Sequence, residues 1–193
     1  DQTGAFPPIF GEYYGVTNSS VFFSLLPYVE QEPLYRSAGT NALSAAAHTT
    51  PVKVFISPAD TTHVGGILDP GNPWGVSSYG ASYQLFGNPD AGDSPQNMGS
   101  STRMDNITDG KSNTIMFAER FGGRCGGYAS LWAHGNWNTP YMAMFAYGNR
   151  AGTAGYSTYG GVPGSVGPSS LFQVQPYPEE TVCDPTRAQT PHI

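Results

Sequence analysis

Glycine and proline interrupt this chain so often that long helices and long strands are not expected. The sequence has 25 glycines and 17 prolines among 193 residues, and both residue types mark turns or end regular elements. Helical periodicity is confined to the start of the chain, and short strands dominate afterwards. We therefore predict an α+β fold with short N-terminal helices packed on an antiparallel β-sheet and with long loops rich in Gly, Pro and Tyr. The length suits one domain over residues 1–193.

The helical signal covers residues 21–29. Ser19 or Ser20 is suited to cap this helix, and Pro27 should kink or divide it. Pro33 begins a second short turn, and residues 41–47 form a weaker helical pattern. The apolar positions that share one helical face are Val21, Phe22, Leu25, Leu26 and Val29.

Strand patterns are short and scattered along the rest of the chain. The sequence predicts strands at 52–56, 78–86 and 113–120, and shorter aromatic segments near 128–133, 141–147 and 171–174. Residues 1–17 are expected to be extended or loop, and 61–76, 87–102 and 148–170 are expected loops. Loops of this length usually carry function or lie against a partner.

The charge balance excludes several classes of protein. A net charge of −6 with only 8 Lys and Arg argues against nucleic-acid binding. A chain with 13% aromatic and 11% charged residues is not of the disordered type. No apolar run reaches the length of a membrane span, and no signal-peptide pattern opens the chain. Low charge with abundant Gly, Ser, Thr and Tyr is typical of extracellular, loop-rich proteins.

The chain has two cysteines, Cys125 and Cys183. Two ligands so far apart do not make a metal site by themselves. A disulfide between them would stabilise the fold by about 4 kcal/mol in the chain-entropy model. The alternative is two unpaired buried thiols. We favour the disulfide, because both cysteines lie in Gly- or Pro-rich loop sequence.

No catalytic pattern is found. The sequence lacks a Gly-x-Ser-x-Gly elbow, a His-Glu-x-x-His motif and a phosphate-binding glycine loop. We therefore expect no enzyme activity and no cofactor. The histidines, which lie in no known motif and are interpreted as ordinary surface or loop residues, are His48, His63, His134 and His192.

Asp105 and Asp109 lie four residues apart, and oxygen ligands at this spacing can hold Ca²⁺. The register is not that of an EF-hand loop. Turn chemistry explains the same stretch, with Asp109-Gly110 reversing the chain and with Ser112 and Asn113 bonding to the backbone. We prefer the turn to a metal site.

Two triplets match the N-glycosylation pattern, beginning at Asn18 and at Asn106. The tryptophans Trp74, Trp132 and Trp137 are candidates for stacking on sugars, and exposed tyrosines could do the same. The competing interpretation is that large rings supply core or subunit packing in a chain poor in regular structure. These features keep an extracellular carbohydrate- or solute-binding module as an alternative function.

Five segments, taken in order, carry a family resemblance. They are Gly-Ala-Phe-Pro-Pro at 4–8, Leu-Leu-Pro-Tyr-Val-Glu-Gln at 25–31 with Leu-Tyr at 34–35, Val-Lys-Val-Phe-Ile-Ser-Pro-Ala-Asp at 52–60, Ser-Tyr at 82–83 and the stretch 107–119. Together they resemble a large pilin-like family of unknown function that is expanded in planctomycetes. In that family the stretch containing Asp109, Gly110, Ser112, Asn113 and Thr114 is identified as a motif, which we interpret as a structural turn.

The resemblance implies a pilin-like head domain from an extracellular, cell-surface filament or fibre, with copies of the same chain as partners and glycans as a further possibility. Family members carry a prepilin-type N-terminus with a long hydrophobic helix and a C-terminal His-x9-Asp-Gly signature. Neither is complete here: the hydrophobic helix is absent, and Pro191-His192-Ile193 matches only the start of the signature. Where the family often has Cys-Pro, this chain has Ser57-Pro58.

Overall fold

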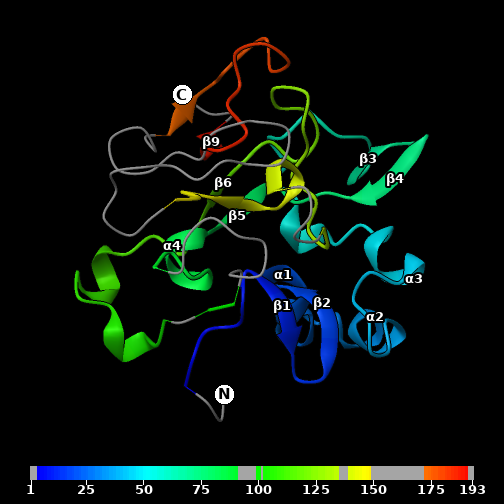
Figure 1. The fold of residues 1–193 in the computed structure, drawn as a ribbon. Helices are drawn as coiled ribbons and strands as arrows, with labels where there is room; N and C mark the ends of the chain where they lie inside the picture. The colour runs from blue at the N-terminus through cyan, green and yellow to red at the C-terminus, as the bar shows by residue number, and fades with distance from the viewer. Residues whose placement is uncertain (1–3, 91–98, 101, 135–138, 149–171, 191–193) are drawn as a thin grey trace.

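The computed structural model describes residues 4–90, 99–100, 102–134, 139–148 and 172–190 (Figure 1). Its helices are short: α1 (Val21–Leu25), α2 (Glu32–Ser37), α3 (Ala45–His48) and α4 (Tyr83–Phe86). Single 3-10 turns are η1 (Leu26–Val29), η2 (Lys53–Phe55), η4 (Met104–Asn106), η5 (Lys111–Asn113) and η6 (Thr139–Tyr141). The strands are β1 (Phe10–Tyr13), β2 (Val16–Ser20), β3 (Ile67–Asp69), β4 (Asn72–Gly75), β5 (Tyr79–Ser82), β6 (Phe117–Glu119), β7 (Met144–Phe145), β8 (Gln173–Val174) and β9 (Gln189–Thr190). The predicted α+β class is confirmed.

The central sheet has three strands in the order β6-β5-β7. β5 runs antiparallel to β6 but parallel to β7, so this sheet is mixed rather than wholly antiparallel. Three two-stranded pairs surround it: the hairpins β1–β2 and β3–β4, and the parallel pair β8–β9.

The predicted N-terminal helix is confirmed and is divided at Pro27 into α1 and η1. The Ser20 hydroxyl accepts a hydrogen bond from the Phe23 amide at 3.0 Å, as expected of an N-cap. The same hydroxyl donates to the Trp132 carbonyl at 2.6 Å. One serine therefore starts the helix and ties it to a segment 112 positions away.

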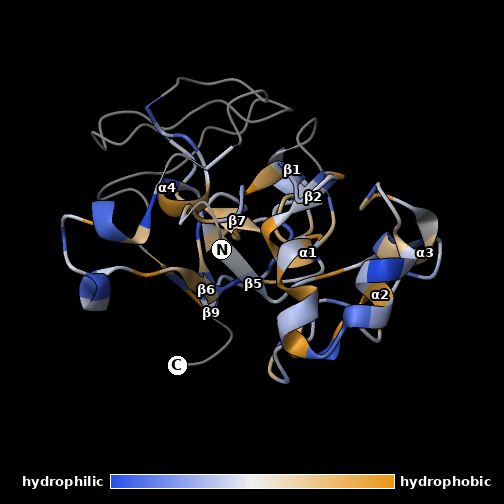
Figure 2. Ribbon diagram, turned by 90° about the horizontal axis from the view of Figure 1, so that it is seen from below, coloured by the Kyte–Doolittle hydropathy of each residue, from blue (hydrophilic) through white to orange (hydrophobic). Residues whose placement is uncertain are grey.

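α1 packs its aromatic residues against the sheet. The Phe22 ring lies 5.8 Å from Phe117 of β6 and 5.1 Å from Phe55 of η2. Phe23 stacks on Trp132 at 6.4 Å, and both rings are fully buried. Figure 2 shows the hydrophobic colouring on α1 and β7 and the hydrophilic colouring on α2.

Several predicted elements were wrong. Residues 52–56 do not form a strand: Val52 and Phe55 are both buried three positions apart, which is the period of the 3-10 turn η2. The strand predicted over 78–86 ends at Ser82, because Tyr83, Leu85 and Phe86 must all enter the core and α4 achieves this.

Two expected loops contain hairpins. Residues 10–20 form β1–β2, whose tip carries Tyr14 and Gly15 with φ of 49° and 75°. Residues 67–75 form β3–β4, and the Asp69 carboxylate accepts hydrogen bonds from the amides of Gly71 and Asn72 at 2.8 and 2.9 Å. The strand predicted over 113–120 is reduced to β6, because residues 111–113 form η5. The expected loop at 148–170 lies almost wholly outside the described residues.

Candidate functional site

A disulfide joins Cys125 to Cys183, with Cα atoms 5.0 Å apart and a sequence separation of 58. Both cysteines are buried against Phe121 in a small apolar cluster of their own. Sequence analysis favoured this pairing over free thiols. The bond attaches the C-terminal segment to the loop that follows β6.

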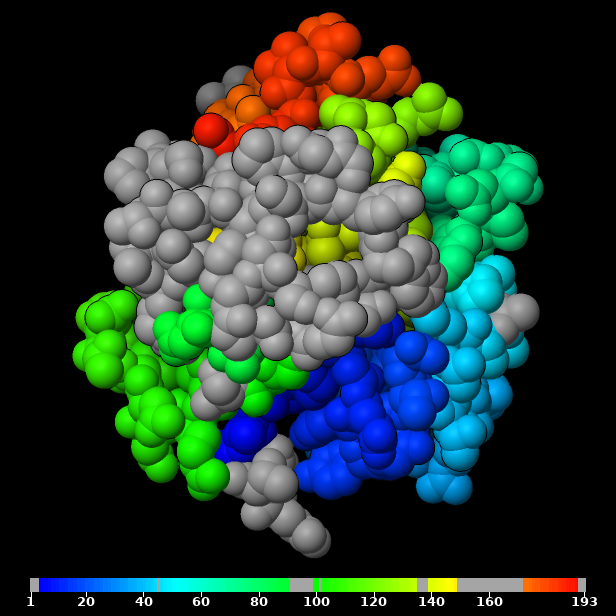
Figure 3. All heavy atoms as spheres, viewed as in Figure 1, coloured from blue at the N-terminus to red at the C-terminus, as the bar shows by residue number. Residues whose placement is uncertain are grey.

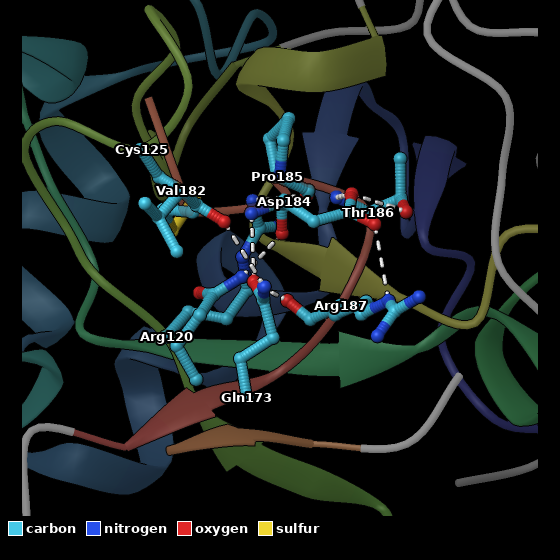
Figure 4. Close-up of polar contacts among 10 residues, drawn as sticks. Arg120, Cys125, Gln173, Val182, Asp184, Pro185, Thr186 and Arg187 are labelled. Atoms are coloured by element: carbon cyan, nitrogen blue, oxygen red, sulfur yellow. Dashed lines mark hydrogen bonds and ion pairs between the residues drawn. A yellow bond between two sulfur atoms is a disulfide. The ribbon is translucent and has the colours of Figure 1, made fainter. Parts of the chain in front are cut away.

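Arg120 fixes the same segment from inside the molecule (Figure 4). Its buried guanidinium donates to the carbonyl oxygens of Met142 at 2.9 Å, of Met144, and of Pro185 at 2.7 Å. Burial lowers the pKa of Arg120 to about 10, and the nearby charge of Asp184 opposes this shift. The group therefore remains a cation at neutral pH, and carbonyl dipoles stabilise its charge.

Two glutamines complete the attachment. Gln189 accepts from the Phe121 amide at 3.2 Å and donates to the Asp184 carbonyl at 2.6 Å. Gln173 accepts from the Asp184 amide at 2.7 Å and donates to the Val182 carbonyl at 3.1 Å. Figure 4 shows the side chains of Arg120 and Gln173 directed toward the segment that contains Val182, Asp184 and Pro185. Side-chain hydrogen bonds therefore add to the β8–β9 pairing in holding the C-terminal segment.

Asp60 fixes the other end of the loop after β6. Its buried carboxylate accepts from the Gly122 amide and the Ser78 hydroxyl, both at 2.7 Å. Its second oxygen accepts from the amide and hydroxyl of Thr62 at 3.0 and 2.6 Å. The Thr62 hydroxyl in turn accepts from the Gly123 amide at 2.9 Å, and a side chain at Gly123 would overlap the Thr62 carbonyl. Sequence analysis quoted Asp60 only as part of the family resemblance.

An open pocket of about 290 Å³ lies between the β3–β4 hairpin, the loop carrying Cys125, η6 and the C-terminal segment. Arg124 and Glu180 form an exposed ion pair in its lining, with Nη1 and Oε1 3.1 Å apart. The rings of Tyr128 and Tyr141 meet edge to face at 5.3 Å and 77°. Leu68, Asp69, Gly127 and Ala129 complete the lining. We call this the Tyr128–Tyr141 pocket.

A row of aromatic rings leads away from the pocket. Tyr141 stacks on His134 at 5.8 Å, and His134 lies 5.3 Å from Trp74. Trp74 stacks on His48 at 4.1 Å. Half-buried Trp74, one of the three tryptophans proposed for sugar stacking, lies in this row. Trp132 is fully buried in the core, so that prediction was wrong for it, and Trp137 lies outside the described residues.

A second feature is a group of four tyrosines near the β1–β2 hairpin, here called the N-terminal tyrosine surface: Tyr13, Tyr14, Tyr28 and Tyr35. Tyr28 is 80% exposed and Tyr14 is 58% exposed. The pKa of Tyr13 is raised to about 12, chiefly by burial and then by the neighbouring Tyr14, Tyr28 and Tyr35. Tyrosine is enriched at protein interfaces.

A third feature is an exposed apolar group on the C-terminal segment, here called the C-terminal apolar surface: Phe172, Val174, Tyr177 and Val182. Val174 is the most exposed of these, at 61%. Figures 1 and 3 show the N-terminal hairpin (blue) and the segment after residue 172 (orange to red) at opposite ends of the molecule. The segments that carry the two surfaces are therefore well separated in the molecule.

Asp105 and Asp109 have different contacts in the structure. Asp105 pairs with Lys111 at 3.5 Å, and the Asp109 carbonyl accepts from the Asn113 side chain at 3.1 Å. Thr114 donates to the Gly110 carbonyl at 3.0 Å. Side-chain bonds from Asn113 and Thr114 thus close the turn of the family motif, in which Ser112 is exposed. Within the described ranges, no group of three or more His, Cys, Asp or Glu is placed to hold a metal ion.

The two glycosylation candidates also differ. Asn106 and Thr108 are exposed on and beside η4. Asn18 is half-buried and donates to the Asn41 side chain at 3.0 Å, and its triplet ends at buried Ser20, which caps α1. The Asn106 triplet is therefore the more exposed of the two candidates.

The three histidines in the described part of the chain have structural contacts rather than a shared site. His48 and His134 lie in the aromatic row, while His63 accepts from the Gly66 amide at 3.1 Å. His192 lies outside the described residues. No helix in the described part of the chain is long and apolar enough to cross a bilayer.

A family model described as a protein of unknown function (DUF1559) matches residues 2–182. No curated protein and no solved structure matches the chain.

Proposed function

Because the chain belongs to the DUF1559 family of proteins of unknown function, we propose that it is a structural subunit of an extracellular filament or fibre, assembled from copies of itself. The observation that carries the proposal is the pair of exposed apolar surfaces at opposite ends of the molecule (Figure 1). Two different surfaces that bind each other head to tail generate an open array, because the contact does not close on itself.

The N-terminal tyrosine surface has the composition of an interface. Tyrosine is enriched among the few residues that dominate the binding energy of protein contacts, because it buries a large area and loses few rotamers. Most of the side chain of Tyr28 and of Tyr14 is exposed to solvent, and this exposure does not stabilise a free monomer. The partner proposed for this surface is the C-terminal apolar surface of a second copy.

Two further observations support the proposal. The segments that resemble a pilin-like family include Leu26–Val29, which is η1 and which carries Tyr28. The disulfide between Cys125 and Cys183 suits an oxidising compartment, which agrees with an extracellular location. The proposal assigns no catalytic step to the chain.

Electron microscopy and sedimentation of the purified, oxidised protein test the proposal. We expect polymers whose length rises with concentration, and we expect the Y14N/Y28S variant to stay monomeric. Asn replaces Tyr14 because Asn-Gly suits a hairpin tip with positive φ. V54S is the matched control, because Val54 is also exposed, at 56%, but lies on η2 and belongs to neither surface. A native protein that remains monomeric across concentrations would contradict the proposal.

A further inference from the structure

We infer that the Tyr128–Tyr141 pocket binds a neutral saccharide. This inference is independent of filament assembly. It rests on the shape of the pocket, on the chemical groups in its lining and on the contacts that hold its walls in place.

The two tyrosines form a corner. Their rings are inclined at 77° with centroids 5.3 Å apart, and both side chains are half-buried. A sugar ring placed in such a corner lays its C–H face on one aromatic ring and its edge against the other. Neither phenolic hydroxyl has a hydrogen-bond partner within the part of the chain that the structure describes, so both are free to bond to sugar hydroxyls.

The polar groups of the lining match a ligand that carries several hydroxyls. Arg124 offers donors and Glu180 offers acceptors side by side, 3.1 Å apart. Neighbouring hydroxyls of a sugar, each both donor and acceptor, bond to such a pair at once. Asp69 contributes further acceptor capacity, because only its Oδ1 is used by the Gly71 and Asn72 amides.

The charges select against acidic ligands. The lining has one cation, Arg124, and two carboxylates, Asp69 and Glu180. Arg124 is already paired, so an added carboxylate or phosphate would meet net negative charge. The whole chain carries a net charge of −6, which acts in the same direction. A neutral sugar is therefore favoured over a uronic acid or a sugar phosphate.

The size and the rigidity of the pocket fit a small ligand. Its volume of about 290 Å³ lies at the lower end of the range for small-molecule sites. The disulfide, Arg120 and Asp60 hold the surrounding segments before any ligand arrives. A site organised in advance loses little free energy to ordering on binding.

The first step of the test is a screen on arrays of neutral and acidic glycans. Binding of the glycans found in the screen is then measured by calorimetric titration. Assembly-deficient Y14N/Y28S protein should be used alongside the native protein, so that loss of polymers and loss of binding are read separately. We expect a neutral glycan to bind both proteins equally and the corresponding uronic-acid glycan to bind neither.

Variants locate the site. Y128A and Y141A should each weaken binding roughly tenfold or more, because each removes one wall of the corner. E180Q changes an exposed side chain without disturbing the core and should also weaken glycan binding. Y128F keeps the aromatic face and should retain most of the binding affinity. Failure of every neutral glycan to bind, preference for an acidic glycan or a peptide, or unchanged binding by Y128A, Y141A and E180Q would overturn the inference.

Discussion

Cys125 and Cys183, 58 positions apart in the sequence, are bonded to each other beside the Tyr128–Tyr141 pocket, whose lining includes Arg124 and Glu180. Arg124 directly precedes the first cysteine, and Glu180 lies on the short segment that ends at the second. The disulfide therefore also sets the distance between the two partners of the exposed ion pair. One covalent bond contributes both to stability and to the shape of the candidate site.

Replacing both cysteines tests that relationship. The C125S/C183S variant should lose about 4 kcal/mol of unfolding free energy, because the unfolded chain regains the freedom of a long loop. Denaturant unfolding of the native protein with and without a reducing agent should give the same difference. The variant itself should not respond to the reducing agent, and a variant as stable as the native protein would contradict the prediction.

Substitution of Asp60 should lower the free energy of unfolding more than substitution of most other polar residues. D60A removes a buried acceptor from the Gly122 amide, the Ser78 hydroxyl and Thr62. Buried donors left without partners cost about 1–3 kcal/mol each, so we expect a loss of about 3 kcal/mol or more. D109A is the control: Asp109 is exposed, and its loss should change unfolding free energy by no more than about 0.5 kcal/mol. Equal effects of the two substitutions would show that the Asp60 contacts do not stabilise the fold.

Arg120 is predicted to hold the C-terminal segment against the sheet. R120M leaves the carbonyls of Met142, Met144 and Pro185 without their donor. Hydrogen exchange should accelerate over residues 172–190 before the rest of the molecule is affected. R120K should restore little of the protection from hydrogen exchange, because an ammonium group cannot reproduce the planar arrangement of guanidinium donors.

R36M provides the matched control for Arg120. Arg36 forms an exposed ion pair with Glu32 at 2.7 Å on α2, and such pairs contribute less than about 0.5 kcal/mol. Unchanged exchange over residues 172–190 in R120M would contradict the assigned role of Arg120.

Ionisation of Tyr13 should make the free energy of unfolding depend on pH in the alkaline range. Its folded pKa is raised from 10.0 to about 12, mainly by burial and then by Tyr14. The folded protein therefore keeps a proton that the unfolded chain releases. This contribution is complete below pH 10 and is lost as the pH rises toward 12. The difference in unfolding free energy between native protein and Y13F should shrink over that interval, and a constant difference would contradict the shift.

The start of the chain shows which features could be predicted from local sequence. Ser20 and Pro27 act within a few residues of their own positions, and the cap and the helix division were both predicted. The β1–β2 hairpin was missed because Gly11 lies at an irregularity in the register and because the first of the two positive-φ positions at the tip is Tyr14, where Asn or Gly is the usual signal. The β3–β4 hairpin was missed because Pro73 stands inside β4, where a proline argues against a strand.

The candidate pocket could not be predicted from sequence for a different reason. Its lining runs from Leu68 to Glu180 and comes from four separate segments. No spacing along the chain links Tyr128 to Tyr141 or Arg124 to Glu180. The two cysteines were the only signal that those segments meet, and they lie beside the pocket rather than in it.

The most direct test of head-to-tail assembly is sedimentation of two complementary variants, alone and mixed. Y14N/Y28S removes the N-terminal tyrosine surface, and V174S/V182S removes the most exposed valines of the C-terminal apolar surface. Each variant alone should be monomeric, while an equimolar mixture should form dimers and nothing larger, because each pair then has one complete contact. A mixture that stays monomeric while the native protein polymerises, or a native protein that never polymerises, would contradict the account.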